Sequence, residues 1–178
     1  MINCKMIHKN TPLKEVVKLA APCRCHACNN GCKYGSGSLA GDDAKNIAKF
    51  LGISEEELKK RFLEEVGLFN KKLLRPKLLR EKGRPYGRCI FHDIKKGCTI
   101  HPVKPLECKT SINCKDYGED LSVWFKVNFV VDTNDAESIR QYANYIKSGG
   151  KLIQGAELES LVPDKEKLRK ILSYEILK

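Results

Sequence analysis

The chain has 178 residues, enough for one domain with its own hydrophobic core, so its nine cysteines are not needed as disulfide staples. Its formal charge of +11 marks a basic protein, and its longest apolar runs fall far short of the roughly 20 residues that cross a bilayer. Lys5, His8 and Lys9 interrupt the stretch where a secretion signal would need an apolar core. We therefore expect a cytoplasmic protein with no membrane segment, in which closely spaced cysteines bind metal more often than they form disulfides.

Helices are predicted on both sides of the first cysteines. Residues 11–22 begin with Thr-Pro, a typical helix start, and finish at a proline that would end the helix. Residues 42–52 carry apolar side chains at helical spacing and end in a glycine. Ser54 and Glu57 form a capping box for another helix that follows at once.

The first cysteines lie in a segment of different composition. Residues 23–41 read CRCHACNNGCKYGSGSLAG, and their Asn, Gly and Ser content favours tight turns over regular structure. We expect this segment to be a loop that presents metal ligands.

A basic segment and a small hairpin come next. Residues 71–88 hold eight Lys or Arg against a single acid, Glu81. Residues 89–92 and 98–101 are predicted to be two short strands joined by a Lys-Lys-Gly turn, each with a cysteine.

The C-terminal portion, about residues 120–178, is predicted to be a strand followed by two helices. Residues 122–132 alternate strictly between apolar and other positions, which is typical of a strand with one buried face. Helices are expected from about Asp135 and from about Asp164. Since the chain has no repeat or linker, we interpret residues 1–178 as one α+β domain, mainly helical, with a small antiparallel β component and cysteine loops stapled by metal.

Eight of the nine cysteines fall into two groups, and these eight are the predicted metal ligands. The groups are Cys23, Cys25, Cys28 and Cys32, spaced C-x-C-x2-C-x3-C, and Cys89, Cys98, Cys108 and Cys114, spaced C-x8-C-x9-C-x5-C. Such thiolates converge at about 2.3 Å from a zinc ion, and short turns pre-organise part of the shell. Two assemblies stay open, because each group can close its own site or the groups can interleave around one or two shared sites.

Zinc and iron both suit these ligands. A zinc ribbon would pair one C-x2-C turn with another, and the sequence has no second one. The number of cysteines therefore favours an iron-sulfur cluster, [4Fe-4S] above other types, over zinc. Cys4 stands apart and is interpreted as a free thiol. His26, His92 and His101 neighbour the cysteines, but enough thiols are present without them.

The order of these motifs resembles the YkgJ-type cysteine-cluster family, also called CxxCxxCC and described as a zinc- or iron-chelating domain. The likeness spans about residues 23–114. It includes the downstream motifs C-I-F at 89–91, C-T-I-H-P at 98–102 and K-P-L-E-C at 104–108. The chain departs from the family where three residues rather than two separate Cys28 from Cys32, and where Lys104 replaces an arginine. The resemblance implies metal chelation without implying a single activity.

Three kinds of function agree with the sequence, and it leaves open whether the chain is an enzyme. An iron-sulfur protein would transfer electrons or act as the partner or subunit of an enzyme. A zinc-binding protein would use a closed structural site. An enzyme that modifies lysines or RNA would keep an open position on its metal. We expect an unknown protein partner, and the basic segment 71–88 offers a contact for nucleic acid or for an acidic protein.

Overall fold

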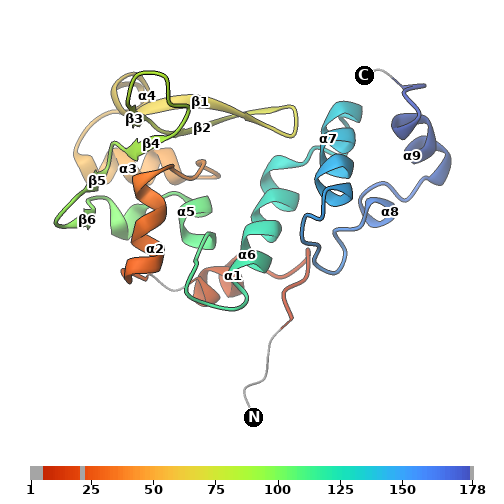
Figure 1. The fold of residues 1–178 in the computed structure, drawn as a ribbon, viewed down its shortest axis with the longest axis horizontal. Coiled ribbons are helices and arrows are strands. Elements are labelled where there is room, and N and C mark those ends of the chain that lie inside the picture. The colour runs from red at the N-terminus through yellow and green to blue at the C-terminus, as the bar shows by residue number, and fades with distance from the viewer. Residues whose placement is uncertain (1–5, 21–22, 177–178) are drawn as a thin grey trace, which may run out of the picture.

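A computed structural model describes residues 6–20 and 23–176, so Cys4 and Pro22 lie outside the described part of the chain. The fold is α+β and mainly helical, with small two-stranded antiparallel sheets, as the sequence predicts. The sheets and the cysteine loops gather on one side of the molecule, and helices α7 to α9 lie on the other (Figure 1). Among the described residues, no helix is both long enough and apolar enough to cross a membrane.

The elements have the following bounds. The α-helices are α1 (Leu13–Leu19), α2 (His26–Asn30), α3 (Asp43–Leu51), α4 (Glu55–Phe62), α5 (Leu106–Thr110), α6 (Gly118–Phe125), α7 (Ala136–Lys147), α8 (Leu158–Leu161) and α9 (Lys165–Leu172). Two 3-10 helices, η1 (Gly31–Lys33) and η2 (His101–Val103), and the π-helix η3 (Lys126–Val130) connect them. The strands pair as β1 (Leu63–Leu68) with β2 (Lys71–Pro76), β3 (Leu78–Arg80) with β4 (Gly87–Cys89), and β5 (His92–Asp93) with β6 (Gly97–Cys98).

The helices predicted from Ser54, from about Asp135 and from about Asp164 are confirmed, as is the stop at Gly52, whereas α1 is shorter than the predicted 11–22 and has no side-chain cap. Helix α3 ends at Gly52, whose φ of 68° is the left-handed conformation of a glycine stop. At the start of α4 the Ser54 hydroxyl accepts a hydrogen bond from the Glu57 amide at 3.0 Å. Asp135 and Asp164 cap α7 and α9 in the same way. These helices form where expected because their caps and apolar stripes are local features of the sequence.

Two expectations for the cysteine segments are corrected. Residues 23–41 are not turns throughout, because α2 and η1 form within them and carry Cys28 and Cys32. The predicted hairpin is shorter than expected, since only β5 and β6 form it, with His92 opposite Cys98. Cys89 belongs instead to β4 and lies opposite Leu78 of β3.

The predicted strand at residues 122–132 is wrong, because this segment forms the end of α6 and the π-helix η3. Val123 and Phe125 are fully buried, but Trp124 between them is also buried, at 3% exposed. The segment is therefore covered on most sides. Its apolar residues do not recur at helical spacing, so the sequence does not indicate a helix here. The Trp124 indole donates to the Thr11 carbonyl at 2.9 Å, which ties this helix to the N-terminal segment.

The β1–β2 hairpin links the two sides of the fold. Its two-residue turn, Phe69–Asn70, has φ values of 47° and 59°, the conformation of a type I′ turn. Phe69 is buried edge-on against Tyr142 of α7, and the side-chain amide of Asn70 donates to the Asp135 carboxylate at 2.6 Å. The tip of the hairpin is therefore packed on the C-terminal helices.

Two hydrophobic clusters form the core. The larger cluster joins α1 and α5 to α6, η3, α7 and α9, and includes the fully buried Phe125, Ile139 and Tyr142. The smaller cluster joins α3 and α4 to the short strands, and includes Ile47 and Leu58. The smaller cluster lies directly beneath the cysteine segments, since Cys89 is one of its members.

Candidate metal centre

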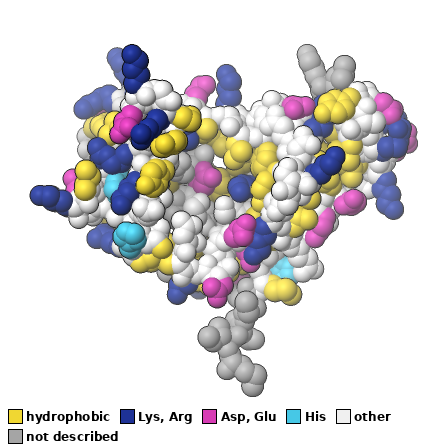
Figure 2. All heavy atoms as spheres, in the orientation of Figure 1, with side chains coloured by type: hydrophobic (Ala, Val, Ile, Leu, Met, Phe, Trp, Pro, Cys, Tyr) yellow, Lys and Arg dark blue, Asp and Glu magenta, His cyan; other side chains and the backbone are white. Residues whose placement is uncertain are grey.

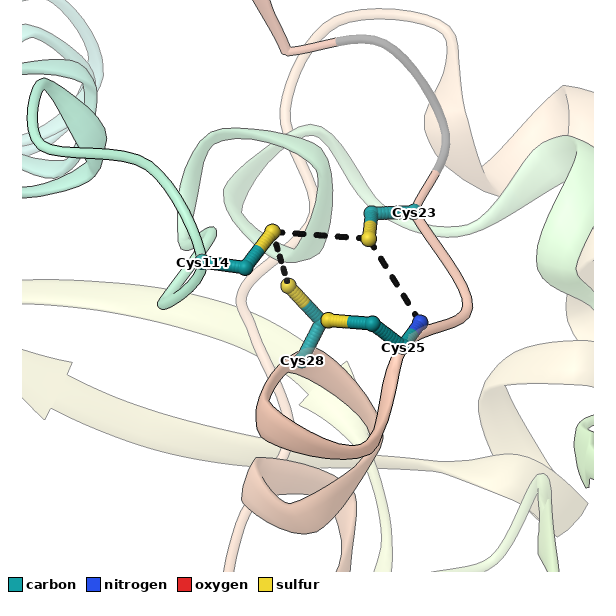
Figure 3. A group of neighbouring side chains, drawn as sticks. All are labelled: Cys23, Cys25, Cys28 and Cys114. Atoms are coloured by element: carbon teal, nitrogen blue, oxygen red, sulfur yellow. Dashed lines mark hydrogen bonds between the residues drawn. The ribbon is translucent and has the colours of Figure 1, made fainter.

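Four thiols converge tightly at the N-terminus of α2. The sulfurs of Cys23, Cys25, Cys28 and Cys114 all lie within 4.8 Å of one another (Figure 3). The Cys28 thiol donates to the Cys114 sulfur at 3.4 Å, and the Cys114 thiol donates to the Cys23 sulfur at 3.4 Å. A tetrahedral zinc ion with bonds of about 2.3 Å holds its sulfurs about 3.8 Å apart. This group, named here the compact set, therefore has the donor chemistry and spacing of a single metal ion.

Local backbone and a distant loop build the compact set together. Cys25 is the residue before α2, Cys28 lies within that helix, and the Cys25 amide donates to the Cys23 sulfur at 3.4 Å. Cys114 comes from the loop between α5 and α6, 86 residues after Cys28. Tertiary folding is therefore required to complete the set.

Two thiols of the compact set have pKa values that are shifted in opposite directions. The backbone amide of Cys28, followed by the Cys23 thiol, lowers the pKa of Cys25 to about 7. Side-chain hydrogen bonds with Cys28, Cys23 and Cys25 raise the pKa of Cys114 to about 12. Cys25 and Cys114 are also the two exposed members. Near neutral pH, the Cys25 thiol of the metal-free set is therefore partly ionised, and this residue is exposed to solvent.

The other four ligand candidates surround a cavity of about 200 Å³. The cavity is lined by Cys32 of η1, Cys89 of β4, Cys98 of β6 and Cys108 of α5, which we name the wide set. Within the described residues, this set does not meet the 4.8 Å limit that the compact set satisfies. Cys23 and Cys28 also line the cavity, so the two sets are neighbours.

Burial dominates the electrostatics of the wide set. It raises the pKa of all four thiols, and that of Cys89 reaches about 12. The charges of Cys32 and Cys98 raise the pKa of Cys89 further, which shows that these thiols act on one another. Four neutral thiols around a cavity would have to release protons to bind a metal.

Gly37 and Lys104 interact with thiols of the wide set, although the sequence analysis did not name either residue as part of the site. The Gly37 amide donates to the Cys108 sulfur at 3.2 Å, and a Cβ at Gly37 would lie only 2.8 Å from that sulfur. Lys104 lines the cavity with 8% of its surface exposed, and its charge lowers the pKa of Cys32 and Cys98. The only sequence signals were the Gly-Ser run around Gly37 and the position of Lys104 six residues after Cys98.

The three histidine candidates have different surroundings. His26 is exposed, and His101 lines the cavity with its Nε2 atom 3.2 Å from the Cys23 carbonyl. His92 is buried with both ring nitrogens unpartnered among the described residues, but it is not one of the residues that line the cavity. None of the three joins the compact set.

The positions of the thiols thus correspond to the interleaved arrangement, and the assignment of the eight cysteines as ligands stays a prediction. Cys114 joins three cysteines of the first group, and Cys32 joins three of the second. All eight predicted ligands lie in one of the two sets, at one end of the molecule.

Comparison with known proteins agrees with a metal-binding role. Neither a curated protein nor a solved structure matches the chain. A family model does match residues 24–137, well over half of the chain, and its title is "Putative zinc- or iron-chelating domain". The matched region contains seven of the eight thiols of the compact and wide sets, all but Cys23. The chain therefore belongs to the CxxCxxCC family of metal-chelating domains.

Proposed function

We propose that the protein holds two metal centres of different kinds and transfers electrons to a partner protein. The compact set would bind one zinc or iron ion, and the wide set would bind an iron-sulfur cluster of the [4Fe-4S] type. The observation that carries this proposal is the difference between the sets in spacing and enclosed volume. Sulfurs 3.4 Å apart suit one ion, whereas four more widely spaced thiols around about 200 Å³ suit a cluster.

Electron transfer is proposed over catalysis because each set supplies four thiols. Four thiolates complete a tetrahedral site or a cluster shell, whereas a catalytic metal keeps an open position. An iron-sulfur cluster would supply a one-electron couple. The positive charge of the buried Lys104 would favour the more negative, reduced state, and the Gly37 amide would do the same through its bond to the Cys108 sulfur.

The first experiment is metal and acid-labile sulfide analysis of protein purified without oxygen. We expect about four iron atoms and four sulfides per chain for the wide set, and one further ion for the compact set. The visible absorbance of the cluster should bleach on reduction. Zinc without sulfide would overturn the cluster proposal, and protein without metal would overturn both centres.

A matched pair of variants assigns each centre to its ligands. Cys89→Ser should lose iron and sulfide but keep the single ion, whereas Cys114→Ser should lose the single ion but keep the cluster. Cys4→Ser is the control, because the sequence places this thiol outside both groups. If Cys114→Ser also abolished the sulfide content, the two sets would instead form one shared centre.

A further inference from the structure

One exposed face combines aromatic side chains with positive charge. Tyr34, from the loop after η1, lies beside Tyr86, which precedes β4, with ring centroids 6.3 Å apart. The two side chains are far apart in the sequence, so their pairing is a product of the fold. Tyr34 is 58% exposed and Tyr86 is 46% exposed, and Leu79 of β3 adds a further exposed apolar side chain.

The backbone around this aromatic pair is well fixed. Strand β4 packs against η1, and the Gly87 amide donates to the Tyr34 carbonyl at 3.4 Å. A Cβ at Gly87 would lie 2.4 Å from the Leu79 carbonyl oxygen, so β3 and β4 approach each other closely at this point. Arg80 joins the Glu64 carboxylate to the Pro85 carbonyl and thereby braces the loop that carries Tyr86. The β3–β4 hairpin therefore carries Tyr86, and a backbone hydrogen bond from this hairpin to Tyr34 holds the second ring beside it.

Cations flank the two tyrosines in the sequence. Lys33 precedes Tyr34 and Lys82 lies four residues before Tyr86; both are exposed and have no ion pair with a described residue. The Arg88 side chain donates to the His92 carbonyl. Arg84 lies over the Tyr86 ring, 5.9 Å from its centroid, and its carboxylate partner is the adjacent Glu81. Figure 2 shows many Lys and Arg side chains on the side of the molecule that carries these hairpins, with exposed hydrophobic side chains between them.

We propose that this face, which we name the Tyr34–Tyr86 face, binds single-stranded nucleic acid. Phosphates would contact the cations, and unstacked bases would stack on the exposed rings, which is how proteins hold single strands without strict sequence preference. An acidic protein segment would also satisfy the cations, but its carboxylates would gain nothing from the two ring surfaces. Exposed aromatic rings among cations therefore favour nucleic acid over acidic protein.

The first test measures binding of the metal-loaded full chain to a labelled single-stranded oligouridylate of about 12 nucleotides by fluorescence anisotropy. Tyr86→Ala should weaken binding about 10-fold, as expected for the loss of one stacked base. Tyr86→Phe should restore binding because it keeps the ring. Phe50→Ala is the matched control, since Phe50 of α3 is an equally exposed ring outside the face, at 48% exposed.

The salt dependence of binding provides a second test. With about four phosphate contacts, the logarithm of the association constant should fall with the logarithm of salt concentration with a slope of about −3. Lys82→Gln should reduce that slope by about 0.7 while leaving the effect of Tyr86→Ala intact.

Three results would overturn the proposal. The oligouridylate could bind no more tightly than a polyglutamate peptide, which would indicate an acidic protein partner. Tyr86→Ala could bind like the wild type, or Phe50→Ala could weaken binding as much as Tyr86→Ala. Metal content and circular dichroism of each variant establish that the fold is intact. Because binding is measured apart from metal content, the nucleic-acid proposal and the metal proposal can fail independently.

Discussion

The cysteine-bearing side and the C-terminal helical side of the molecule differ in the size of the hydrophobic cluster that each contains. On the helical side, α6, η3, α7 and α9 enclose the larger hydrophobic cluster, with Phe125, Ile139 and Tyr142 fully buried. On the cysteine side, short strands and short helices cover a smaller cluster, and thiols surround a cavity. Small folds with little apolar burial commonly gain stability from metal. We expect metal binding to compensate for the smaller hydrophobic cluster on the cysteine side.

Removal of metal should have the largest effect, and it should destabilise the cysteine side while leaving the helical side folded. Structural metal centres contribute on the order of 10 kcal/mol to folding. A chelator with a reductant should therefore expose the amides of α3, α4 and the β5–β6 hairpin to exchange, while those of α7 stay protected. Hydrogen exchange read by mass spectrometry checks this outcome. Equal loss of protection in α7 would mean that the halves unfold together.

Truncation of a side chain in the helical core should lower stability without changing metal content. Ile139→Ala removes a fully buried side chain and should lower the free energy of unfolding of the helical side by about 4 kcal/mol. Metal content should not change. Leu172→Ala on α9 is the control, because that side chain is 41% exposed and should cost much less. Thermal unfolding and metal analysis measure both quantities, and loss of metal from Ile139→Ala would contradict the comparison.

A single methyl group should disturb the wide set alone. In Gly37→Ala the new Cβ would meet the Cys108 amide nitrogen at 2.7 Å and its sulfur at 2.8 Å, so the backbone that carries Cys108 must shift. We expect a loss of stability of about 2 kcal/mol and a lower iron and sulfide content. Gly35→Ala, two residues away, meets no atom within 4 Å and should retain both. Normal iron retention by Gly37→Ala would show that this close packing does not matter to the site.

The smallest predicted effect concerns an ion-pair cluster in which Glu64 of β1 contacts Arg75 of β2 and Arg80 of β3. Hydrogen bonding to Arg80, and then to Arg75, lowers the pKa of Glu64 to about 2. Glu64→Gln should therefore cost about 1 to 2 kcal/mol near neutral pH. Because the folded-state pKa lies below the usual value of 4.5, the difference from wild type should be constant above about pH 5 and shrink as pH falls toward 2.

Urea denaturation of both proteins between about pH 3 and about pH 7, a range that extends below the usual carboxylate pKa of 4.5, measures this difference. Glu65→Gln is the control, since the Glu65 side chain is 68% exposed and lies 3.9 Å from Lys72. A difference for Glu64→Gln that does not decrease at pH 4 would indicate that the charge of the carboxylate is not responsible.

Short-range signals account for what the sequence predicted correctly. The start of α4 at Ser54, the stop of α3 at Gly52 and the cap of α7 at Asp135 depend on neighbouring residues, and each lies where it was predicted. The chemistry of the candidate ligands was equally visible, because clustered cysteines in a basic, polar chain indicate metal binding without any knowledge of the fold.

Tertiary structure decided the rest. The alternating segment around Trp124 became a helix because neighbouring helices bury it on most sides, which removes the pattern that distinguishes a helix from a strand. Cys114 belongs to the compact set and Cys32 to the wide set because loops that are distant in the sequence pack together. The spacing of cysteines along the chain carries no information about that packing. Long-range packing also buries Lys104 beside the cavity and places the Tyr34 ring next to that of Tyr86. The sequence by itself determined which residues can bind metal, whereas long-range packing determined how they are combined.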